Sequence, residues 1–259
     1  MIHELWLHWQ FIKMRLAQRM AYRADFILGA FAFFLFQFIA PIVVGVIYFA
    51  GGEFPGWTMN TILLLQGILA LVRGFSFMFF VGILWNTHIK IRKGTLDLLL
   101  LRPINTLWLF IMDSFDEEDV GQVLGGVVIT AFALSRIGEL PGSIALCILL
   151  AIVGVLFILS LALISSALTI VFVKTHRIYE FIDLIMTFAS YPKTIYNKTL
   201  SVAFSVVLPL FVMSYYPASA LLGRSLELAV PSVFVTLGLV LFSIWVWYKA
   251  LKSYKSAGG

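Results

Sequence analysis

The stretch SIALCILLAIVGVLFILSLALISSALTIVFV, residues 143–173, contains no charged residue and only small polar side chains among its apolar ones. An α-helix rises about 1.5 Å per residue, so this run is long enough to extend beyond the hydrocarbon core of a bilayer, which is about 30 Å thick. A run of this length without charged residues would not be stable at the surface of a soluble domain. The segment therefore predicts a membrane-spanning helix, and it sets the fold class of the chain.

The composition of the whole chain agrees with this prediction. Of the 259 residues, 61% are hydrophobic and only 12% are charged, with a mean hydropathy of +1.01, whereas soluble domains are about 25% charged. The other apolar runs leave no room for a soluble domain, so we expect residues 1–259 to form a single all-α transmembrane domain. The single cysteine, Cys147, excludes an internal disulfide and a cysteine-based metal site.

Hydropathy predicts spans at residues 26–50, 61–85, 120–135, 143–173 and 229–250. The apolar stretch before the last span is broken by Pro192, Pro209 and Pro217, and proline interrupts a helix by removing a donor and crowding the preceding turn. We interpret it as a further span at about 177–192 and an external re-entrant hairpin over 193–222. The alternative is one long kinked span. The predicted total is six transmembrane helices.

Basic residues predict the orientation of these spans. With the N-terminus inside, 13 of the 18 lysines and arginines fall on the cytoplasmic side, a bias that sets topology by the positive-inside rule. Six spans then place both termini in the cytoplasm of a multi-pass plasma-membrane protein. We attribute the net charge of +5 to contact with the anionic lipid bilayer and expect no nucleic-acid partner.

The first 25 residues have a different pattern from the spans. Apolar side chains recur there at spacings of three and four, and basic residues take other positions. This pattern predicts an amphipathic helix over 1–25 that lies in the membrane interface, with tryptophans at headgroup depth. The alternative is a basic flank of the first span. The apolar positions are Ile2, Leu5, Trp9, Ile12, Leu16 and Met20.

The loop 86–119, predicted to be cytoplasmic, contains the charged segment IKIRKGTLDLLLLRPIN at residues 89–105. Gly94 is expected to end the preceding helix, Thr95 to cap a new one, and Pro103 to stop it. The result is a helix of about two turns. Its leucines cover more than one face, so they must be buried against lipid, the bundle or a partner protein.

Two parts of the sequence carry a resemblance to a known family. RKGTLDLLLLRPI (92–104) resembles the segment Gly-Thr-Leu-(Glu/Asp)-x-Leu-Leu-x-x-Pro in the first cytoplasmic loop of ABC-2-type exporter permeases. ASYPKTIYNKTLSVAFSVVLPLFVMSYYPASALLGR (189–224) is similar to the Tyr-Pro-x-x-Ile-Tyr, Pro-Leu/Ala-Phe and Tyr-Pro-Ala series of one branch of that class. The order of spans, charged loop, proline-broken stretch and basic tail extends the likeness over nearly the whole chain.

The resemblance implies the transmembrane half of an ATP-driven exporter that moves an amphiphilic or lipid-like cargo by alternating access. It implies a second permease half, as a homodimer or heterodimer, and a separate ATP-binding subunit. This chain would bind no cofactor, and ATP and Mg²⁺ would bind that subunit. The relatives often have an acidic residue ahead of the glycine where this chain has HIKIRK (88–93), which leaves individual salt bridges open. By position, the ATPase-coupling residues are Lys90, Arg92, Gly94, Thr95, Asp97, Leu98, Arg102 and Pro103.

The residues themselves agree on the absence of an ATPase site. No phosphate-binding loop of the form G-x-x-x-x-G-K-[ST] occurs in the chain. The four histidines are scattered and no nucleophile constellation is visible, so we expect neither an enzyme nor a metal site. The segment would act as a short lever that passes the motion of the ATPase to the spans.

Arg73 falls within the second predicted span, where a charge costs about 2.5–3.5 kcal/mol on insertion scales. It is expected either to line the translocation path or to form a structural ion pair with Glu180 or Asp183, which lie three residues apart on one helix face. On the outer side, broken helices need protein or water to satisfy their backbone. This requirement fits an external gate built from Tyr191, Pro192, Pro209, Tyr216 and Pro217.

Two further features precede and begin the third span. The acidic patch DSFDEED (113–119) is interpreted as a solvated helix N-terminus, favoured by the helix dipole, with contact to the ATPase as the alternative. Gly121 and Gly125 form a small-residue pair of the GxxxG type. We expect it to pack within the bundle more than at a dimer seam.

Two other functions compete with the permease hypothesis. The first is an ATP-independent secondary transporter or channel, in which Arg73, Glu180 and Asp183 carry ion coupling. The second is a membrane-bound enzyme or assembly scaffold. A secondary transporter has no need of a short leucine-rich helix outside the membrane, and an enzyme should show convergent titratable groups. The charged loop therefore favours the permease.

Overall fold

The computed structural model describes residues 10, 13, 23–172 and 178–254. Their regular structure is helical, apart from one isolated bridge between Phe54 and Trp57. Five stretches are long and apolar enough to cross a membrane, and each begins and ends within a few residues of a predicted span, except that the second continues to residue 92. They are Arg23–Phe49, Met59–Arg92, Val120–Ile137, Ile144–Phe172 and Ala229–Ser253.

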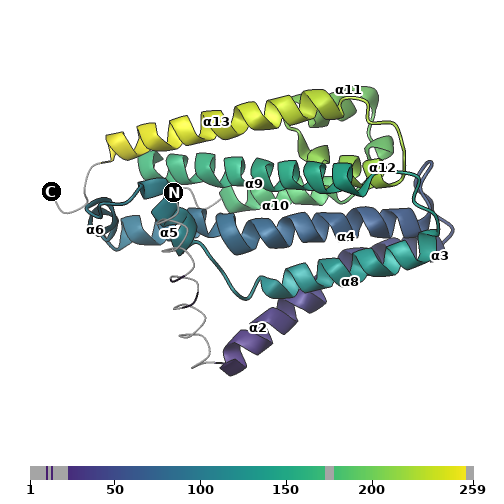
Figure 1. The fold of residues 1–259 in the computed structure, drawn as a ribbon, viewed down its shortest axis with the longest axis horizontal. Coiled ribbons are helices and arrows are strands. Elements are labelled where there is room, and N and C mark those ends of the chain that lie inside the picture. Colours follow the sequence, from purple (N-terminus) through teal and green to yellow (C-terminus); the bar gives the residue numbers. More distant parts are fainter. Residues whose placement is uncertain (1–9, 11–12, 14–22, 173–177, 255–259) are drawn as a thin grey trace.

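The helices form one elongated bundle (Figure 1). α4 (Met59–Ser76) packs against α8 (Val120–Ile137) and α9 (Ile144–Phe172), α9 packs against α13 (Ala229–Ser253), and α8 packs against α2 (Arg23–Phe36). One hydrophobic core lies between α4, α9 and the short helices near residue 212, and a second lies around Trp247. α6 and the C-terminal end of α13 lie at one end of the bundle, and α12 lies at the other.

The first predicted span is two helices with a break between them. α2 ends at Phe36, turn residues follow, and α3 (Ile39–Phe49) begins at Ile39. Pro41 lies four residues after Gln37, so it has no N–H to donate to the carbonyl of Gln37, and its ring crowds that carbonyl. The break exposes the Gln37 side chain to neighbouring helices.

The second span is the longest continuous helical element. α4 continues into a π-helical turn, η1 (Phe77–Val81), and then into α5 (Gly82–Arg92). Together these 34 residues measure about 50 Å at 1.5 Å per residue. A core of about 30 Å leaves several turns outside it, so the helix that crosses the membrane also reaches the charged segment. α6 (Leu96–Leu100) and α7 (Thr106–Asp113) follow it.

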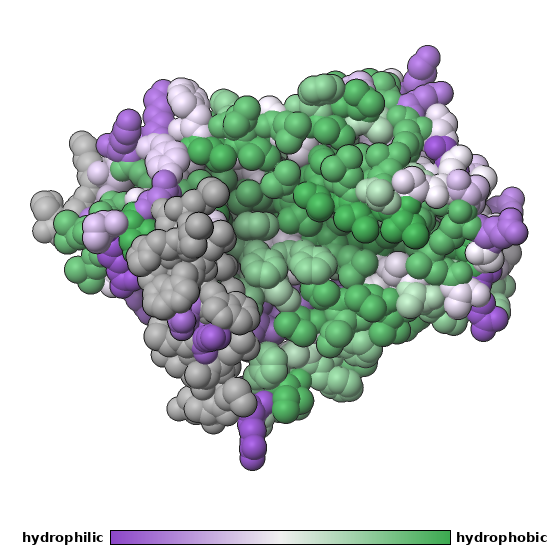
Figure 2. All heavy atoms as spheres, viewed as in Figure 1, coloured by the Kyte–Doolittle hydropathy of each residue, from purple (hydrophilic) through white to green (hydrophobic). Residues whose placement is uncertain are grey.

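The surface has the pattern of a protein surrounded by lipid. Figure 2 shows a broad hydrophobic zone over the middle of the molecule with hydrophilic residues gathered toward its two ends. Large apolar side chains are exposed on α3, α8, α9 and α13, with Phe49 at 90% and Leu241 at 71%. Exposure of this extent is unstable in water and favourable in hydrocarbon. The chain is a multi-pass membrane protein.

The stretch before the last span consists of short pieces. α10 (Ile178–Ala189) has 12 residues and measures about 18 Å, less than the thickness of the hydrocarbon core. After it come η2 (Lys193–Ile195), α11 (Lys198–Val202), η3 (Ala203–Val207), η4 (Leu210–Met213) and α12 (Tyr215–Leu221). A sixth span and a re-entrant hairpin over 193–222 stay predictions. Most of the predicted interfacial helix lies outside the described residues.

Glycines allow the close approach of α8 to its neighbours, as we expected for Gly121 and Gly125. A Cβ atom on Gly121 would lie 1.8 Å from the backbone oxygen of Ala30 in α2, and one on Gly125 would lie 2.8 Å from the Cβ of Gln37. Gly126 faces the other way, toward the backbone of Leu71 in α4. Small residues let backbones meet closely where no hydrophobic effect drives association. The GxxxG pair therefore packs within the bundle.

We predict that Gly121→Ala will lower the thermal unfolding midpoint of the purified chain in detergent, because the added methyl group must push α2 and α8 apart. Overpacking of this kind costs about 1–3 kcal/mol. Gly238→Ala is the matched control: this helical glycine in α13 has open space around its Cβ position. Equal midpoints for the two variants, measured by loss of monodispersity on heating, would show that the α2–α8 contact is not close.

Candidate functional site

The charged segment lies at the end of the bundle where α5 stops. α5 ends at Arg92, Gly94 adopts a positive φ of 63°, and α6 begins at Leu96. Glycine tolerates this left-handed conformation without steric cost, so the prediction that Gly94 ends the preceding helix is confirmed. Pro103 follows α6, which has only five residues. The predicted length of two turns was therefore too long.

The capping role predicted for Thr95 is wrong. Thr95 occupies the N-cap position, but its side chain accepts no hydrogen bond from the helix, because its φ and ψ of −94° and −1° are helical rather than extended. The cap in this region is at the next helix, where Asn105 Oδ1 accepts from the backbone N–H of Trp108 at 3.2 Å. Asp97 lies in the first turn of α6.

The leucines of α6 divide between the bundle and the surface. Leu96 and Leu99 are buried against the second core, together with Ile91 and Phe110. Leu98 and Leu101 are 66% and 81% exposed. The buried pair fixes α6 to the bundle, and the exposed pair leaves an apolar surface on its outer side. Arg92, Arg102 and Pro103 are exposed next to them.

Polar contacts hold this end of the bundle rigid. Lys90 of α5 forms an ion pair with Asp113 at the end of α7, and Asn86 Nδ2 donates to the backbone oxygen of Asp113 at 2.7 Å. Tyr248 of α13 donates to Asn105 Oδ1 at 3.1 Å. Deeper in the core, Ser166 of α9 joins Thr87 of α5 at 2.6 Å and accepts from Trp247 Nε1 at 3.2 Å. These contacts therefore link α5, α7, α9 and α13 to one another at this end of the bundle.

A groove of about 470 Å³ lies beside the exposed leucines. It is lined by both charged and apolar residues of α5, α6 and α7, and so it brings together four of the predicted coupling residues. The other four, Arg92, Gly94, Asp97 and Pro103, are not part of its lining. Its lining is Lys90, Thr95, Leu98, Leu99, Arg102, Ile104, Leu109, Met112 and Asp113.

A second candidate site surrounds Arg73. Arg73 Nη2 lies 3.4 Å from Asp183 Oδ1 of α10, and the guanidinium lies over the ring of Phe77 at 5.2 Å from its centroid. The arginine therefore pairs with Asp183, one of its two predicted partners. Glu180 is exposed in the first turn of α10 and stays apart from the site.

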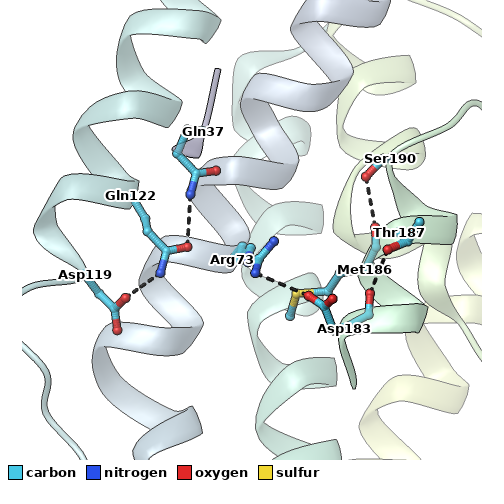
Figure 3. A network of polar contacts seen from close by, with 8 residues as sticks. All are labelled: Gln37, Arg73, Asp119, Gln122, Asp183, Met186, Thr187 and Ser190. Carbon is cyan, nitrogen blue, oxygen red and sulfur yellow. Dashed lines mark hydrogen bonds and ion pairs between the residues drawn. The ribbon is translucent and has the colours of Figure 1, made fainter. Parts of the chain in front are cut away.

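A chain of amides lies on the other side of Arg73 (Figure 3). Gln37 Nε2 donates to Gln122 Oε1 at 3.1 Å, and Gln122 Nε2 donates to Asp119 Oδ1. This chain connects the break between α2 and α3 with the N-terminal end of α8. No pattern in the sequence predicted this chain, and the break at Pro41 that separates α2 from α3 was not predicted either.

The acidic patch is not the solvated helix N-terminus that we predicted. Glu117 and Asp119 are only 3% and 5% exposed, and Asp119, at the N-cap of α8, makes no capping hydrogen bond. Burial, with the negative charge of Asp116 as a smaller cause, raises the pKa of Asp119 to about 7. The prediction failed because the patch folds back against the bundle, where the backbone N–H of Asp116 donates to the oxygen of Met78 at 2.9 Å.

Arg73, Asp116, Asp119 and Asp183 line one cavity of about 660 Å³. Its walls come from α2, α3, α4, the N-terminal end of α8 and α10. The described residues contain no group of three or more histidine, cysteine or carboxylate side chains placed to hold a metal ion. The cavity, with its mixed polar and apolar lining, is a candidate ligand site or passage.

The predicted gate residues separate into two groups. Tyr191 lines the cavity and lies 6.0 Å from the ring of Phe54. Tyr216 is fully buried, donates to Ser205 Oγ at 2.9 Å, and packs against Phe211. Pro217 is buried beside it in α12, and Pro192 and Pro209 precede η2 and η4. Only Tyr191 of this set reaches the cavity.

The comparison with protein families gives one match. Residues 34–258 match the family model described as ABC-2 family transporter protein. The matched region contains the charged segment, the cavity and the broken stretch before α13. No curated protein and no solved structure matches the chain.

We predict that Asp183→Asn will lower the thermal midpoint and that the exchange Arg73→Asp with Asp183→Arg will restore most of the loss. The side chains are 33% and 52% exposed, so the pair contributes about 1 kcal/mol. Glu180→Gln is the control, since it removes a carboxylate from the same helix away from Arg73. If the exchanged double variant is as unstable as the two single losses combined, the pair does not stabilise the bundle.

Proposed function

Because the chain belongs to the ABC-2 transporter family, we propose that it is the transmembrane half of an ATP-driven exporter. Permeases of this family are transmembrane parts of ABC transporters that work with an ATP-binding subunit. In this proposal a separate subunit binds ATP and Mg²⁺ and hydrolyses the nucleotide. The chain supplies the path and the surface on which that subunit acts.

The observation that carries the proposal is the exposed face of α6. Leu98 and Leu101 leave apolar area beside a groove that ends in Lys90 and Arg102. Apolar area rimmed by charge is typical of a protein-binding surface. The same helix is fixed from behind by Leu96 and Leu99, which are buried in the second core. A partner that moves on α6 therefore moves the membrane helices.

We place the α6 end in the cytoplasm of a plasma-membrane protein. α5 ends in Lys90 and Arg92, α13 ends in Lys252, and both helices stop at that end of the bundle (Figure 1). Segments rich in lysine and arginine stay on the cytoplasmic side of the membrane. The opposite end, with α12 and the loop between α3 and α4, would then face outside. Arg224 lies over Trp57 there at 4.2 Å.

The cavity at Arg73 supports a path that a second permease half would complete. It opens along α2, α3 and α10, whose outer faces expose Ile27, Phe36, Ile42 and Phe181. A second half facing these helices would enclose the cavity between two copies or two related chains. Alternating access would then open it to one side at a time, with Tyr191 at its outer part. An amphiphilic cargo matches its mixed lining.

A secondary transporter is the second candidate, and the Arg73–Asp183 pair favours it. An intramembrane ion pair that opens and closes can couple transport to an ion gradient. That function leaves the exposed leucines of α6 without a role. The two candidates differ in whether transport requires a subunit that binds at α6.

We predict that Leu98→Asp with Leu101→Asp will abolish co-purification of the chain with its ATP-binding subunit. A charge placed in an apolar contact must be desolvated without a partner. Lys252→Asp is the control, because this exposed residue changes charge at the same end of the bundle without touching α6. Undiminished co-purification of the leucine variant, with the control also intact, would exclude α6 as the docking surface.

We also predict that the purified chain alone hydrolyses no ATP above the rate of empty detergent micelles, and that hydrolysis appears when the partner is added. The measurement is phosphate release with and without the partner. A partner mutated in its phosphate-binding loop serves as the control. ATP turnover by the isolated chain would contradict the assignment of hydrolysis to a separate subunit.

A further inference from the structure

The cavity at Arg73 has an excess of negative charge. Its charged lining consists of three carboxylates, on Asp116, Asp119 and Asp183, and one guanidinium, on Arg73. The guanidinium is already engaged by Asp183 and by the ring of Phe77. The carboxylates of Asp116 and Asp119 lie at the other side of the cavity, where the lining contains no further cation. Because burial raises the pKa of Asp119 to about 7, this carboxylate is only partly ionised at neutral pH, and the lining has between one and two more negative than positive charges.

A buried amide in the same lining has unused hydrogen-bonding capacity. Gln66 of α4 is 6% exposed, lines the cavity, and its Oε1 atom has no hydrogen-bond partner among the described residues. A buried carbonyl oxygen without a donor costs about 1–3 kcal/mol. A glutamine with a purely structural role is expected to have a hydrogen-bond partner for this oxygen. A ligand that places positively polarised atoms near this oxygen would offset that cost.

The rest of the lining is apolar and rich in aromatic rings. Phe33, Phe36, Phe77, Trp85 and Tyr191 contribute their rings, and Val43, Val44 and Leu69 contribute aliphatic side chains. The faces of aromatic rings attract cations through their quadrupole, most strongly where water is excluded. An inorganic cation would leave this apolar area unused, and an anion would face the carboxylates. The combination matches a cation that is itself largely apolar.

We propose that this cavity is a binding site for lipophilic organic cations, and that the cargo of the transporter belongs to this class. Only the statement that these cations are the cargo rests on the proposed function. Binding itself needs no ATPase. The positive centre would lie in the part of the cavity lined by Asp116 and Asp119, and the apolar part would lie against the rings of α2, η1 and α5. Arg73 would oppose binding by its charge and would set an upper limit on the affinity.

Tetraphenylphosphonium and tetraphenylborate test the proposal, because they have nearly the same size and shape and opposite charge. The purified full-length chain in lipid nanodiscs is titrated with radiolabelled tetraphenylphosphonium in a scintillation proximity assay, with empty nanodiscs subtracted. We expect saturable binding that unlabelled tetraphenylphosphonium displaces and tetraphenylborate does not. Asp119→Asn should weaken it about tenfold, as expected for one charge at close range.

Arg73→Gln tests whether the charge of the lining controls the affinity for the cation. Loss of a positive charge should tighten binding of the cation several-fold, whereas general damage to the bundle would weaken it. Glu139→Gln removes an exposed carboxylate from the loop after α8, outside the cavity lining. It should leave binding unchanged. Each variant is accepted only if its elution profile and helical content match those of the parent chain.

Three results would overturn the proposal: no saturable binding, equal displacement by the anion, or weaker binding in Arg73→Gln with Asp119→Asn unchanged. None of them would affect co-purification with the ATP-binding subunit. Conversely, failure of that co-purification with cation binding intact would contradict the exporter and leave the site in place. The two failures are therefore separate observations.

Discussion

Hydrocarbon offers no water to backbone N–H and C=O groups, and this constraint determines the rest of the structure. Helices satisfy it within each span, and hydroxyl side chains adopt the same solution. Ser76, Thr87 and Thr236 each donate to the carbonyl four residues earlier, at 2.6, 2.7 and 2.8 Å. Polar residues can therefore occupy the core without partners from outside. The places where helices depart from this regular hydrogen bonding are therefore the candidates for a functional role.

The two candidate sites lie on one continuous element. α4, η1 and α5 carry Arg73 at the cavity and Lys90 at the charged end, separated by about 25 Å along the axis. At the charged end the element is fixed to α7 through Asp113 and to α9 through Ser166. At the cavity it meets α8 through Gly67 and Gly74, which allow near contact of the backbones. One continuous helix therefore joins the charged end of the bundle to the polar residues at the cavity.

Sequence reasoning was strongest where one periodic property extended over many residues. The five long helices, the end of α5 at Gly94 and the pairing of Arg73 with Asp183 follow from apolar length, turn chemistry and the cost of an isolated charge. Five apolar helices are found, and the sixth span rests on a stretch whose helix α10 is short.

The features that sequence missed depend on contacts between distant segments. Asp119 looks solvated in a run of acids, but the fold of the loop after α7 buries it. The leucines of α6 look equivalent, yet packing against the second core, which several helices build, buries Leu99 and leaves Leu98 exposed. Gln66 gave no signal, because its neighbours in the cavity come from α2, α8 and α10.

The π-helical turn at Phe77–Val81 has a consequence for how the two sites are aimed. A turn of this kind holds about one residue more than an α-helical turn, and one residue corresponds to about 100° of rotation. Every side chain of α5 is therefore turned by that angle from its direction in an unbroken α-helix. This phase offset lets a single rod point Arg73 toward α10 and Lys90 toward α7. Deleting one residue from the wide turn would keep the rod and misalign its two ends.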